Sequence, residues 1–452
     1  MPAPYELTIS QATAQIREGT LSPVKLVESC LAQIDRLEPK VQAWVTVDRE
    51  NALEAARERE RQLRQGRPLG LLHGIPVGVK DIFYTKGLKT TAGSPLYANF
   101  IPSYDATSVA KLKEAGAIIL GKTVTTQFAA GDAGPTRNSW NLEHTPGGSS
   151  QGSGAAVGAR MCPAALGSQT VGSTLRPASY NGCVGFKATY GRVSRYGVIP
   201  LAWSLDHVGI IVRSVEDAAR LLQAMAGHDP NDPSSAERPV DDYLSGLSRG
   251  TSSPRIGLLR GYFLQECDDE TRRHTEAAAQ KLAKAGAKVE EINMPASFEM
   301  ARIAQRIVSN VETASFHEEA MRKDPEAYAP GLRRSIQVGL TIPGSYYLQA
   351  QRLRRRFRLD MELVASNFDV LMTPSTPAPA PKGITTTGNA MFQAPWTFTG
   401  LPALSIPSGL SQSGLPLGVQ LITNPFREAH LLSVGRWCEQ SLDVSLFPPL
   451  AK

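Results

Sequence analysis

The residues of this chain whose type and spacing could perform chemistry are a lysine and three serines. Lys80 ends a short apolar run, HGIPVGVKD, and the turn GGSS contains Ser149 and Ser150. A third serine, Ser173, follows 24 residues after Ser149. A serine hydroxyl becomes a good nucleophile only when a base takes its proton, and lysine is such a base only when its pKa falls from about 10.4 to about 7–8. Burial at the end of an apolar strand favours that shift, and Lys80 occupies such a position.

Two other motifs compete with this set. GAIILGKT, residues 116–123, has the letters of a phosphate-binding loop, but its four central residues are themselves an apolar strand preceded by a helix, which does not suit a nucleotide site. GSSQG, residues 148–152, has the letters of a nucleophile elbow centred on Ser150. The preceding WNLEHTP is a poor strand, and neither His207 nor His430 has a setting that marks it as a base. An esterase of the α/β-hydrolase type that uses Ser150 remains an alternative.

The elements that must position these residues alternate between strands and helices, which predicts the α/β class. Residues 6–65 have helical periodicity. Strand, helix and strand follow between residues 73 and 120, and again between 255 and 294. Residues 296–366 are predicted to be helical with a break at Pro343–Gly344, and short strands and turns are expected after 368. The Gly/Ser segment 147–154 runs into an apolar stretch, so we interpret it as a shaped turn inside the core rather than a linker.

Composition excludes several classes of protein. The chain has 452 residues, 42% hydrophobic and 20% charged, and a net charge of +6. We interpret the arginines between 352 and 358 as a solvated helix face, because few aromatic residues accompany them, and we expect no nucleic-acid partner. Five scattered cysteines show no metal-ligand spacing, so we expect no metal, no cofactor and no disulfide. The N-terminus lacks the pattern of a signal peptide and no apolar run could span a membrane, which predicts a cytoplasmic protein.

The motifs together resemble the amidase signature family almost from end to end. The resemblance is carried by HGIPVGVKD (73–81), TPGGSSQGSGAAVGA (145–159), LGSQTVGSTLRPASYNGCVGFKATYGRVS (166–194), SLDHVG (204–209) and the closing segments TGLPALSIPSGL and GLPLGVQLI. It implies a central twisted mixed β-sheet between helices, with a helical sub-lobe, in a single amidase domain over 1–452. Within it we expect N-terminal helices at about 6–65, a catalytic core at about 66–225 and 368–440, and an α/β and helical portion at about 226–367 covering the site.

The resemblance also assigns roles. It implies a catalytic triad of Lys80, Ser149 and Ser173, with a cis peptide bond at Ser149. Backbone N–H groups of the turn should form the oxyanion hole; these belong to Thr170, Val171, Gly172 and Ser173. Asp81, next to Lys80 on the strand, should point to the opposite face.

This chain departs from the commonest family pattern in the turn before the nucleophile. Gln169 stands where an acid is usual, and Val171 where a glycine is usual. Arg176 lies three residues after the nucleophile instead of two, as in a branch of the family with QTxGSxxRPA. It either meets a substrate carboxylate or forms a structural salt bridge, for example with Asp206. Ser150 either supports the site by hydrogen bonds or caps the helix that starts near residue 152.

The expected activity is hydrolysis of amide C–N bonds, including those of aryl amides (anilides) and carbamates (urethanes), by a serine amidohydrolase that acts as a monomer or homodimer on a small molecule. An amidotransferase-type subunit of a multi-subunit complex is the alternative. The residues expected to line the substrate pocket are Gln127, Phe128, Met391, Phe392 and Trp396, which would suit a hydrophobic group.

Overall fold

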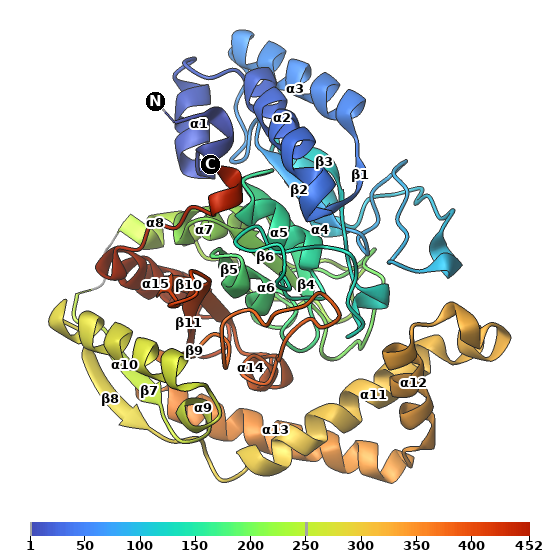
Figure 1. Ribbon diagram of the computed structural model, residues 1–452, viewed down its shortest axis with the longest axis vertical. Coiled ribbons are helices and arrows are strands. Elements are labelled where there is room, and N and C mark those ends of the chain that lie inside the picture. The colour runs from blue at the N-terminus through green and yellow to red at the C-terminus, as the bar shows by residue number, and fades with distance from the viewer. Residues whose placement is uncertain (1, 249–251) are drawn as a thin grey trace.

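The computed structural model describes residues 2–248 and 252–452, and one sheet of eleven strands runs through them (Figure 1). The strands lie in the order β1-β3-β2-β4-β6-β5-β10-β11-β9-β7-β8. Their bounds are β1 (Trp44–Val47), β2 (Pro76–Lys80), β3 (Ile118–Thr123), β4 (Ala164–Gln169), β5 (Val184–Lys187), β6 (His207–Val212), β7 (Arg255–Leu259), β8 (Lys288–Ile292), β9 (Val370–Pro374), β10 (Ala403–Leu410) and β11 (Pro416–Ile422).

The sheet is mixed, and its parallel part brings the candidate site together. β2 is parallel to both β3 and β4, whereas β4 is antiparallel to β6. Because β2 and β4 are parallel neighbours, their carboxyl ends meet at one edge of the sheet. Lys80 and Gln169 are the last residues of these two strands. All five residues of β2 and all six of β4 are buried, as expected of parallel strands covered on both faces.

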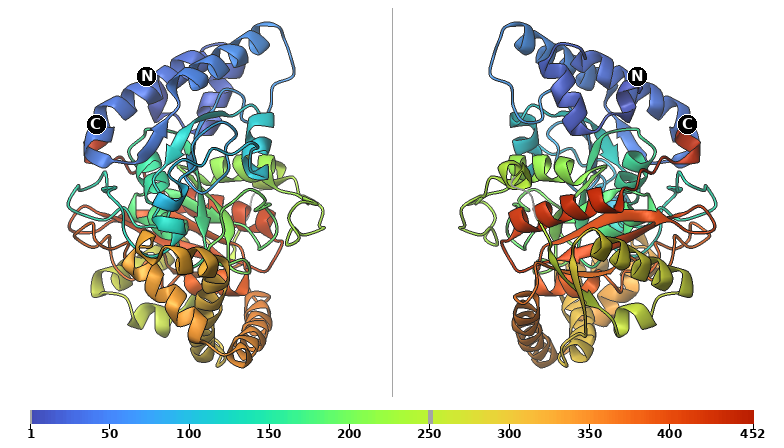
Figure 2. Two further views of the ribbon diagram at one scale, coloured as in Figure 1. Left: turned by 90° about the vertical axis from the view of Figure 1, so that its right-hand side faces the viewer. Right: turned by 90° about the vertical axis from the view of Figure 1, so that its left-hand side faces the viewer.

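Helices flank the sheet in all three views (Figures 1 and 2). They are α1 (Ile9–Arg17), α2 (Pro23–Val41), α3 (Arg49–Arg64), α4 (Thr107–Glu114), α5 (Gln151–Gly158), α6 (Leu175–Tyr180), α7 (Val215–Met225), α8 (Tyr243–Ser248), α9 (Tyr262–Gln265), α10 (Asp269–Lys284), α11 (Phe298–Lys323), α12 (Pro330–Thr341), α13 (Gly344–Ala365), α14 (Ala394–Thr399) and α15 (Glu428–Leu442). Helix α11 packs against both α12 and α13, and the three form a helical lobe (Figure 1). The expected α/β architecture and its helical sub-lobe are therefore present.

The Gly/Ser segment leads into the core of the molecule. Every residue of α5 is buried, and so is every residue of α6, which follows the turn carrying Ser173. Small residues allow α5 to approach its neighbours closely: a Cβ on Gly152 would lie 2.2 Å from the carbonyl oxygen of Ala43. The segment is thus a turn inside the core, as its apolar continuation indicated.

Three local expectations from the sequence are wrong. The N-terminal region is not entirely helical, because β1 forms the edge of the sheet antiparallel to β3. The helical stretch 296–366 has a second break between α11 and α12, near Pro325. The segment after 368 contains two helices, α14 and α15, besides its strands. A four-residue strand and a six-residue helix are too short for their periodicity to be recognised.

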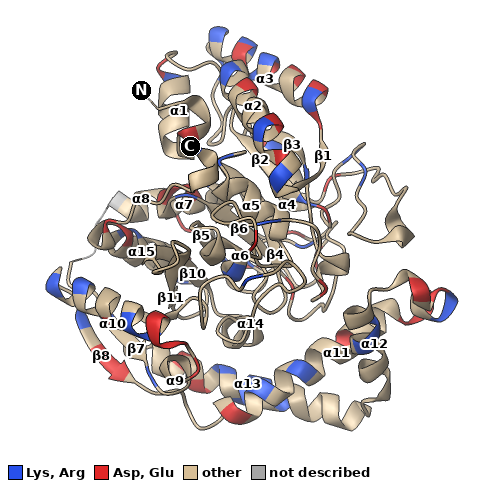
Figure 3. Ribbon diagram, in the orientation of Figure 1, with Lys and Arg blue, Asp and Glu red and all other residues tan. Residues whose placement is uncertain are grey.

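Charged residues lie mainly on the outer helices (Figure 3). The arginines of α13 follow this distribution: Arg356 and Arg358 form ion pairs one turn along the helix with Asp360 and Glu362. Arg354 instead turns inward and donates to the carbonyl oxygens of Phe398 and Ser204. These contacts are those of a solvated helix with one structural arginine.

Candidate active site

Lys80 lies at the centre of the candidate site. Its side chain is fully buried, and its Nζ lies 2.7 Å from the Oγ of Ser149 and 2.7 Å from the Oγ of Ser168. Burial holds the pKa of Lys80 well below its usual value, and the negative charge of Asp206 opposes that shift. In both contacts the Nζ donates to a hydroxyl oxygen, and neither partner carries a charge that would hold a further proton on the amine.

The double-serine turn supplies one of these hydroxyls. The peptide bond between Gly148 and Ser149 is cis, as the resemblance implied. The carbonyl oxygen of Ser149 accepts a hydrogen bond of 3.2 Å from the N–H of Thr126. The side chain of Ser149 is fully buried. Ser149 is therefore held by its backbone on one side while its hydroxyl meets Lys80 on the other.

Ser150 has a bridging role in the structure. It is the N-cap residue of α5, but its side chain makes no capping hydrogen bond. Its Oγ instead donates to the carbonyl oxygen of Ser168 and accepts from the N–H of Ser168, at 3.2 and 3.1 Å. Gly167 makes room for it, since a Cβ there would lie 2.9 Å from the Ser150 Oγ. The fully buried Ser150 thus ties the turn to β4, and the interpretation of its side chain as a helix cap is wrong.

Ser173 lies in the turn between β4 and α6, at the wall of a cavity of about 700 Å³. Thr170, Val171 and Gly172 line the same cavity. The carbonyl oxygen of Ser173 accepts a 3.3 Å hydrogen bond from the N–H of Ser150, so the turn is joined directly to the double-serine turn. Parallel pairing of β2 and β4 therefore brings Lys80, Ser149 and Ser173 to one edge of the sheet.

The two unusual residues of this turn fit it without strain. Gln169 accepts hydrogen bonds from the N–H groups of Thr174 and Leu175, at 3.0 and 3.1 Å, and its Nε2 donates to the Oγ1 of Thr397 at 2.9 Å. Thr397 in turn donates to the carbonyl oxygen of Val171 at 2.8 Å. The φ angle of Val171 is not positive, so its β-branched side chain meets no steric penalty there. Gln169 and Thr397 together brace the turn against α14.

Arg176 is occupied by the protein itself. Its guanidinium donates to the carbonyl oxygens of Gly148 (2.5 Å) and Gly388 (2.7 Å), and to the Oγ1 of Thr387 (3.2 Å). Burial lowers its pKa to about 10. The suggested salt bridge to Asp206 is wrong, because Asp206 accepts hydrogen bonds from the Thr170 hydroxyl and from two backbone N–H groups. Arg176 holds the turn at Gly148 to the loop that precedes α14.

The prediction of individual pocket residues is mostly wrong. Gln127 bonds the backbone of the segment between α11 and α12, and Phe128 packs against His317 and Tyr328. Phe392 and Trp396 are fully buried and pack against Phe263. None of these four lines the cavity at Ser173, and Met391 lines the neighbouring one. Apolar side chains next to a site look the same in sequence whether they face a ligand or the core.

Most of the residues that line the cavity are small or polar, and Arg176, Leu201, Leu332 and Pro381 are exceptions. The lining includes residues from the segment before the double-serine turn (Ala129, Ala130, Gly131), from α11 (Ser309, Asn310, Thr313), from α12 (Leu332, Ser335) and from the loop before α14 (Thr386, Thr387, Gly388, Asn389, Ala390). Helices α11 and α12 of the helical lobe thus form one wall of the cavity.

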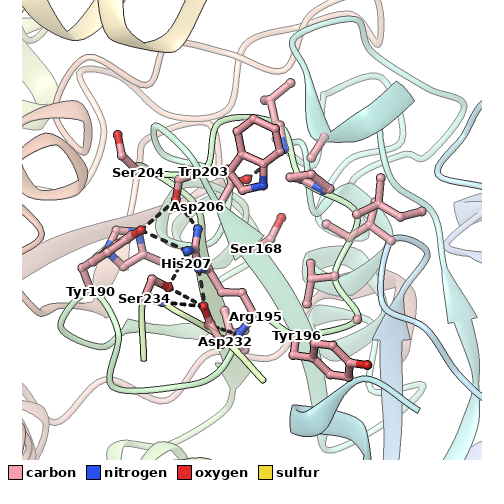
Figure 4. A pocket seen from close by; sticks show the side chains of 18 of the residues that line it. Ser168, Tyr190, Arg195, Tyr196, Trp203, Ser204, Asp206, His207, Asp232 and Ser234 are labelled. Atoms are coloured by element: carbon pink, nitrogen blue, oxygen red, sulfur yellow. Dashed lines mark hydrogen bonds and ion pairs between the residues drawn. The ribbon is translucent and has the colours of Figure 1, made fainter. Parts of the chain in front are cut away.

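Sequence reasoning missed Ser168 and the environment of Asp206. Both residues line a second cavity of about 530 Å³ (Figure 4). Tyr190, Arg195 and His207 surround it, and Arg195 is held by Tyr190 and Ser234. Alternation along the strands could not have found Ser168, because the register that pairs Val79 with Leu166 gives Ser168 the parity of Val79 rather than that of Lys80.

The competing phosphate-loop motif is part of the sheet. Gly121, Lys122 and Thr123 belong to β3, and Lys122 is fully buried with its Nζ against the carbonyl oxygen of Phe83. In the described ranges 2–248 and 252–452, no cluster of three or more His, Cys, Asp or Glu residues is arranged to hold a metal, and no helix is long and apolar enough to cross a membrane. The five cysteines are free and buried.

The fold and the lysine–serine cluster define a class of enzyme that cleaves C–N bonds. A family model described as "Amidase" matches residues 25–432, and the chain belongs to the amidase signature family. One subunit of the glutamyl-tRNA(Gln) amidotransferase of Geobacter metallireducens is 40% identical over 473 residues, which cover 97% of each chain.

Solved structures agree with this assignment. One, described as an unexpected vestigial protein complex that reveals the evolutionary origins of an s-triazine catabolic enzyme, has a TM-score of 0.91 at 31% identity and covers 97% of this chain and 99% of that chain. The native peptide amidase from Stenotrophomonas maltophilia has a TM-score of 0.87 at 30% identity, with full coverage of both chains. The chain is therefore similar both to amidotransferase subunits and to peptide amidases.

Proposed function

We propose that this chain is a serine amidohydrolase that cleaves linear amides through an acyl-enzyme on Ser173. The single observation that carries the proposal is the buried Lys80 amine, which lies 2.7 Å from the hydroxyls of both Ser149 and Ser168. A buried ammonium flanked by hydroxyls alone is costly, whereas a neutral amine there is a ready proton acceptor.

The proposed reaction moves one proton along two serines. The Oγ of Ser173 attacks the amide carbonyl carbon while its proton passes to Ser149, whose own proton passes to Lys80. The carbonyl oxygen becomes negative and is held by N–H groups of the turn at Thr170, Val171, Gly172 and Ser173. The C–N bond then breaks as Ser149 returns a proton to the leaving nitrogen. Water, activated by the same relay, releases the acid from Ser173.

The substrate class follows from the walls of the cavity. The small and polar residues beside Ser173 leave space for a planar amide or carbamate group. Arg176 makes three hydrogen bonds within the protein, so it is a poor partner for a substrate carboxylate. Although Arg176 lines the cavity, its bonds within the protein lead us to propose uncharged acyl groups, with aryl amides and carbamates among them. We further propose that the chain acts on small molecules as a monomer or homodimer.

A second function, the amide-cleaving component of an amidotransferase-type complex, is favoured by the curated relatives. The relative from Geobacter metallireducens is named as a component of such an enzyme, and the alignment covers 97% of this chain. The comparisons support this second function more directly than they support the stand-alone amidase. The two functions share the reaction at Ser173, and they differ in whether the purified chain turns over amides by itself.

One set of experiments tests the reaction and separates these functions. A fluorophosphonate probe should label Ser173, as read by peptide mass spectrometry, and Ser173→Ala should prevent labelling while Ser150→Ala should not. The purified chain is then assayed alone for release of ammonia or amine from glutamine, anilides, aliphatic amides and carbamates, with its mass measured by gel filtration. Turnover of several uncharged amides by the chain alone contradicts the amidotransferase function. Labelling at Ser150 contradicts the triad and favours the esterase alternative.

A further inference from the structure

Two charged side chains of the helical lobe bind one serine in the loop that precedes β6. Glu312, on α11, accepts hydrogen bonds from the N–H of Ser204 at 2.8 Å and from its hydroxyl at 2.6 Å. Arg354, on α13, donates from Nη1 to the Oγ of Ser204 at 2.7 Å and from Nη2 to its carbonyl oxygen at 2.6 Å. The N–H, the hydroxyl and the carbonyl of Ser204 are therefore all bonded to the lobe.

The same loop is bonded to the oxyanion turn, residues 170–173, whose N–H groups hold the carbonyl oxygen in the proposed reaction. Asp206 lies two residues after Ser204 (Figure 4) and accepts a 2.6 Å hydrogen bond from the hydroxyl of Thr170. Its other carboxylate oxygen accepts from two N–H groups earlier in the loop, at 2.8 and 3.0 Å. Because these bonds close the loop, the position of Ser204 on the lobe constrains the position of Thr170.

Arg354 is also bonded to a second element that holds the oxyanion turn. Its Nε donates to the carbonyl oxygen of Phe398, in α14, at 2.6 Å. The preceding residue, Thr397, donates to the carbonyl oxygen of Val171 at 2.8 Å. One guanidinium thus connects the loop that bonds Thr170 with the helix that bonds Val171. Its planar fork fixes the spacing of these contacts, which the ammonium of a lysine cannot reproduce.

Arg354 and Glu312 are placed to act on the site from outside it. Neither of them lines the cavity at Ser173. Glu312 is buried, and its carboxylate also accepts from the hydroxyl of Tyr347 at 2.9 Å. A buried charge is costly unless hydrogen bonds compensate it, and such an arrangement adds little net stability compared with apolar packing. The contribution expected of these two residues is therefore geometric, because they hold the loop and α14 at fixed positions relative to each other.

We propose that Arg354 and Glu312 are positioning residues of the oxyanion turn, through which the helical lobe controls the reaction at Ser173. The proposal rests on the proposed hydrolysis at Ser173 and adds two residues that act on it without touching the substrate. The donors of an oxyanion hole must lie about 2.7–3.1 Å from the position that the negative oxygen takes. A small displacement of the turn therefore weakens binding of the transition state more than binding of the substrate.

The first test is a kinetic comparison on the best amide of the panel. Arg354→Lys keeps the positive charge but cannot bond Ser204 and Phe398 together, so kcat should fall about tenfold while KM stays within about twofold. The acid limb of the pH–rate profile should stay in place, because the charge is kept. Glu312→Gln keeps one acceptor oxygen for Ser204 and should lower kcat by about threefold.

The second test measures the oxyanion turn directly with an inhibitor. A trifluoromethyl ketone that carries the acyl group of the same amide forms a tetrahedral adduct with Ser173, in which the former carbonyl oxygen is negative. Its inhibition constant should rise in Arg354→Lys by the factor by which kcat falls, because the adduct and the transition state use the same N–H groups. The corresponding secondary alcohol cannot form the adduct, and its inhibition constant should stay within about twofold.

The controls separate positioning from a general loss of structure. Arg356→Lys is the matched control, because Arg356 also lies on α13 but is exposed and paired with Asp360 on its own helix. It should leave kcat and both inhibition constants unchanged. Urea unfolding checks the fold of each variant. If Arg354→Lys folds poorly, Ser204→Ala replaces it: this variant removes only the hydroxyl contacts, and it should lower kcat about threefold with a matching change for the ketone.

The outcomes also separate this inference from the proposed function. An unchanged kcat in folded Arg354→Lys overturns the positioning role, while the hydrolysis at Ser173 stands. A rise in KM alone, or an equal loss of affinity for the ketone and the alcohol, overturns it as well, since either would show an effect on substrate binding rather than on the transition state. If the wild-type chain turns over no amide and Ser173 is not labelled, both proposals fall together.

Discussion

Two lysines on neighbouring parallel strands are both fully buried, but their surroundings differ. One is the proposed catalytic base, and the other is a structural partner of a buried carboxylate. Lys80 on β2 contacts two serine hydroxyls, whereas Lys122 on β3 lies 3.8 Å from Asp81 and contacts the carbonyl oxygen of Phe83. Burial lowers the pKa of both, that of Lys122 to about 7.

The difference shows that burial alone does not make a base. The carboxylate of Asp81 lies beside Lys122 and favours its ammonium form. The hydroxyls of Thr85 and Thr90 donate to the carbonyl oxygen of Phe83, so they accept from Lys122. Lys80 has hydroxyls that can donate as well as accept, next to a cavity that contains Ser173. Burial favours the neutral form of the Lys80 amine, and its hydrogen-bond partners, the hydroxyls of Ser149 and Ser168, carry no charge. Asp81 points to the Lys122 side, as the alternation along β2 predicted.

The largest expected effect comes from removing the proposed base. Lys80→Met should lower kcat on an amide by on the order of 10⁴-fold, as should Ser173→Ala, because the members of such a set act as one unit. The double variant should be little worse than either single one. Steady-state kinetics on the best amide of the panel measures this. Retention of most activity in Lys80→Met would show that another group accepts the proton.

Lys122→Met should affect stability rather than chemistry. The free energy of unfolding should fall by about 3–5 kcal/mol, because the buried Asp81 loses its partner. The pKa of Asp81, already raised by burial, would rise further without the Lys122 charge that lowers it. Urea unfolding measures the loss, and kcat per folded molecule should stay within about twofold. Adding Asp81→Asn should recover part of the stability; a large loss of kcat in Lys122→Met would contradict the contrast between the two lysines.

A smaller effect is expected at Gln169. Gln169→Glu keeps acceptors for the N–H groups of Thr174 and Leu175 but loses the donor to Thr397. It also adds a negative charge at the residue after Ser168, whose Oγ contacts Lys80. We expect kcat to fall about tenfold through the loosened turn. The acid limb of the pH–rate profile should also move to higher pH, since the new charge raises the pKa of Lys80. Thr397→Val should lower kcat without moving that limb. It therefore separates the effect of losing the hydrogen bond between Gln169 and Thr397 from the effect of the added charge.

The smallest change concerns Asp206. Its negative charge raises the pKa of Lys80 against the effect of burial. Activity requires the neutral amine, so kcat/KM increases with pH as Lys80 loses its proton and levels off above its pKa. Asp206→Asn removes the opposing charge and should move this acid limb to lower pH, with kcat at the plateau reduced about threefold through the altered bond to Thr170. An unchanged or upward limb would show that Asp206 is uncharged when the enzyme works.

The sequence by itself determined the family, the α/β class, the strand that ends in Lys80 and the candidate set of Lys80, Ser149 and Ser173. It also argued against the nucleotide-binding interpretation of the phosphate-loop motif, because apolar residues at the centre of that motif indicate a strand. The family and the candidate set come from the resemblance of the motifs to the amidase signature family, whereas the α/β class and the strand that ends in Lys80 depend on residue type and periodicity along short segments.

The tertiary structure alone decided the partners of those residues. Arg176 and Thr387 are 211 residues apart, and Gln169 and Thr397 are 228 residues apart. Contacts at such separations depend on how the helical lobe and the loop before α14 pack on the sheet. The apolar residues named for the pocket failed for the same reason: hydrophobicity shows that a side chain avoids water, and only the packing shows whether core or ligand covers it.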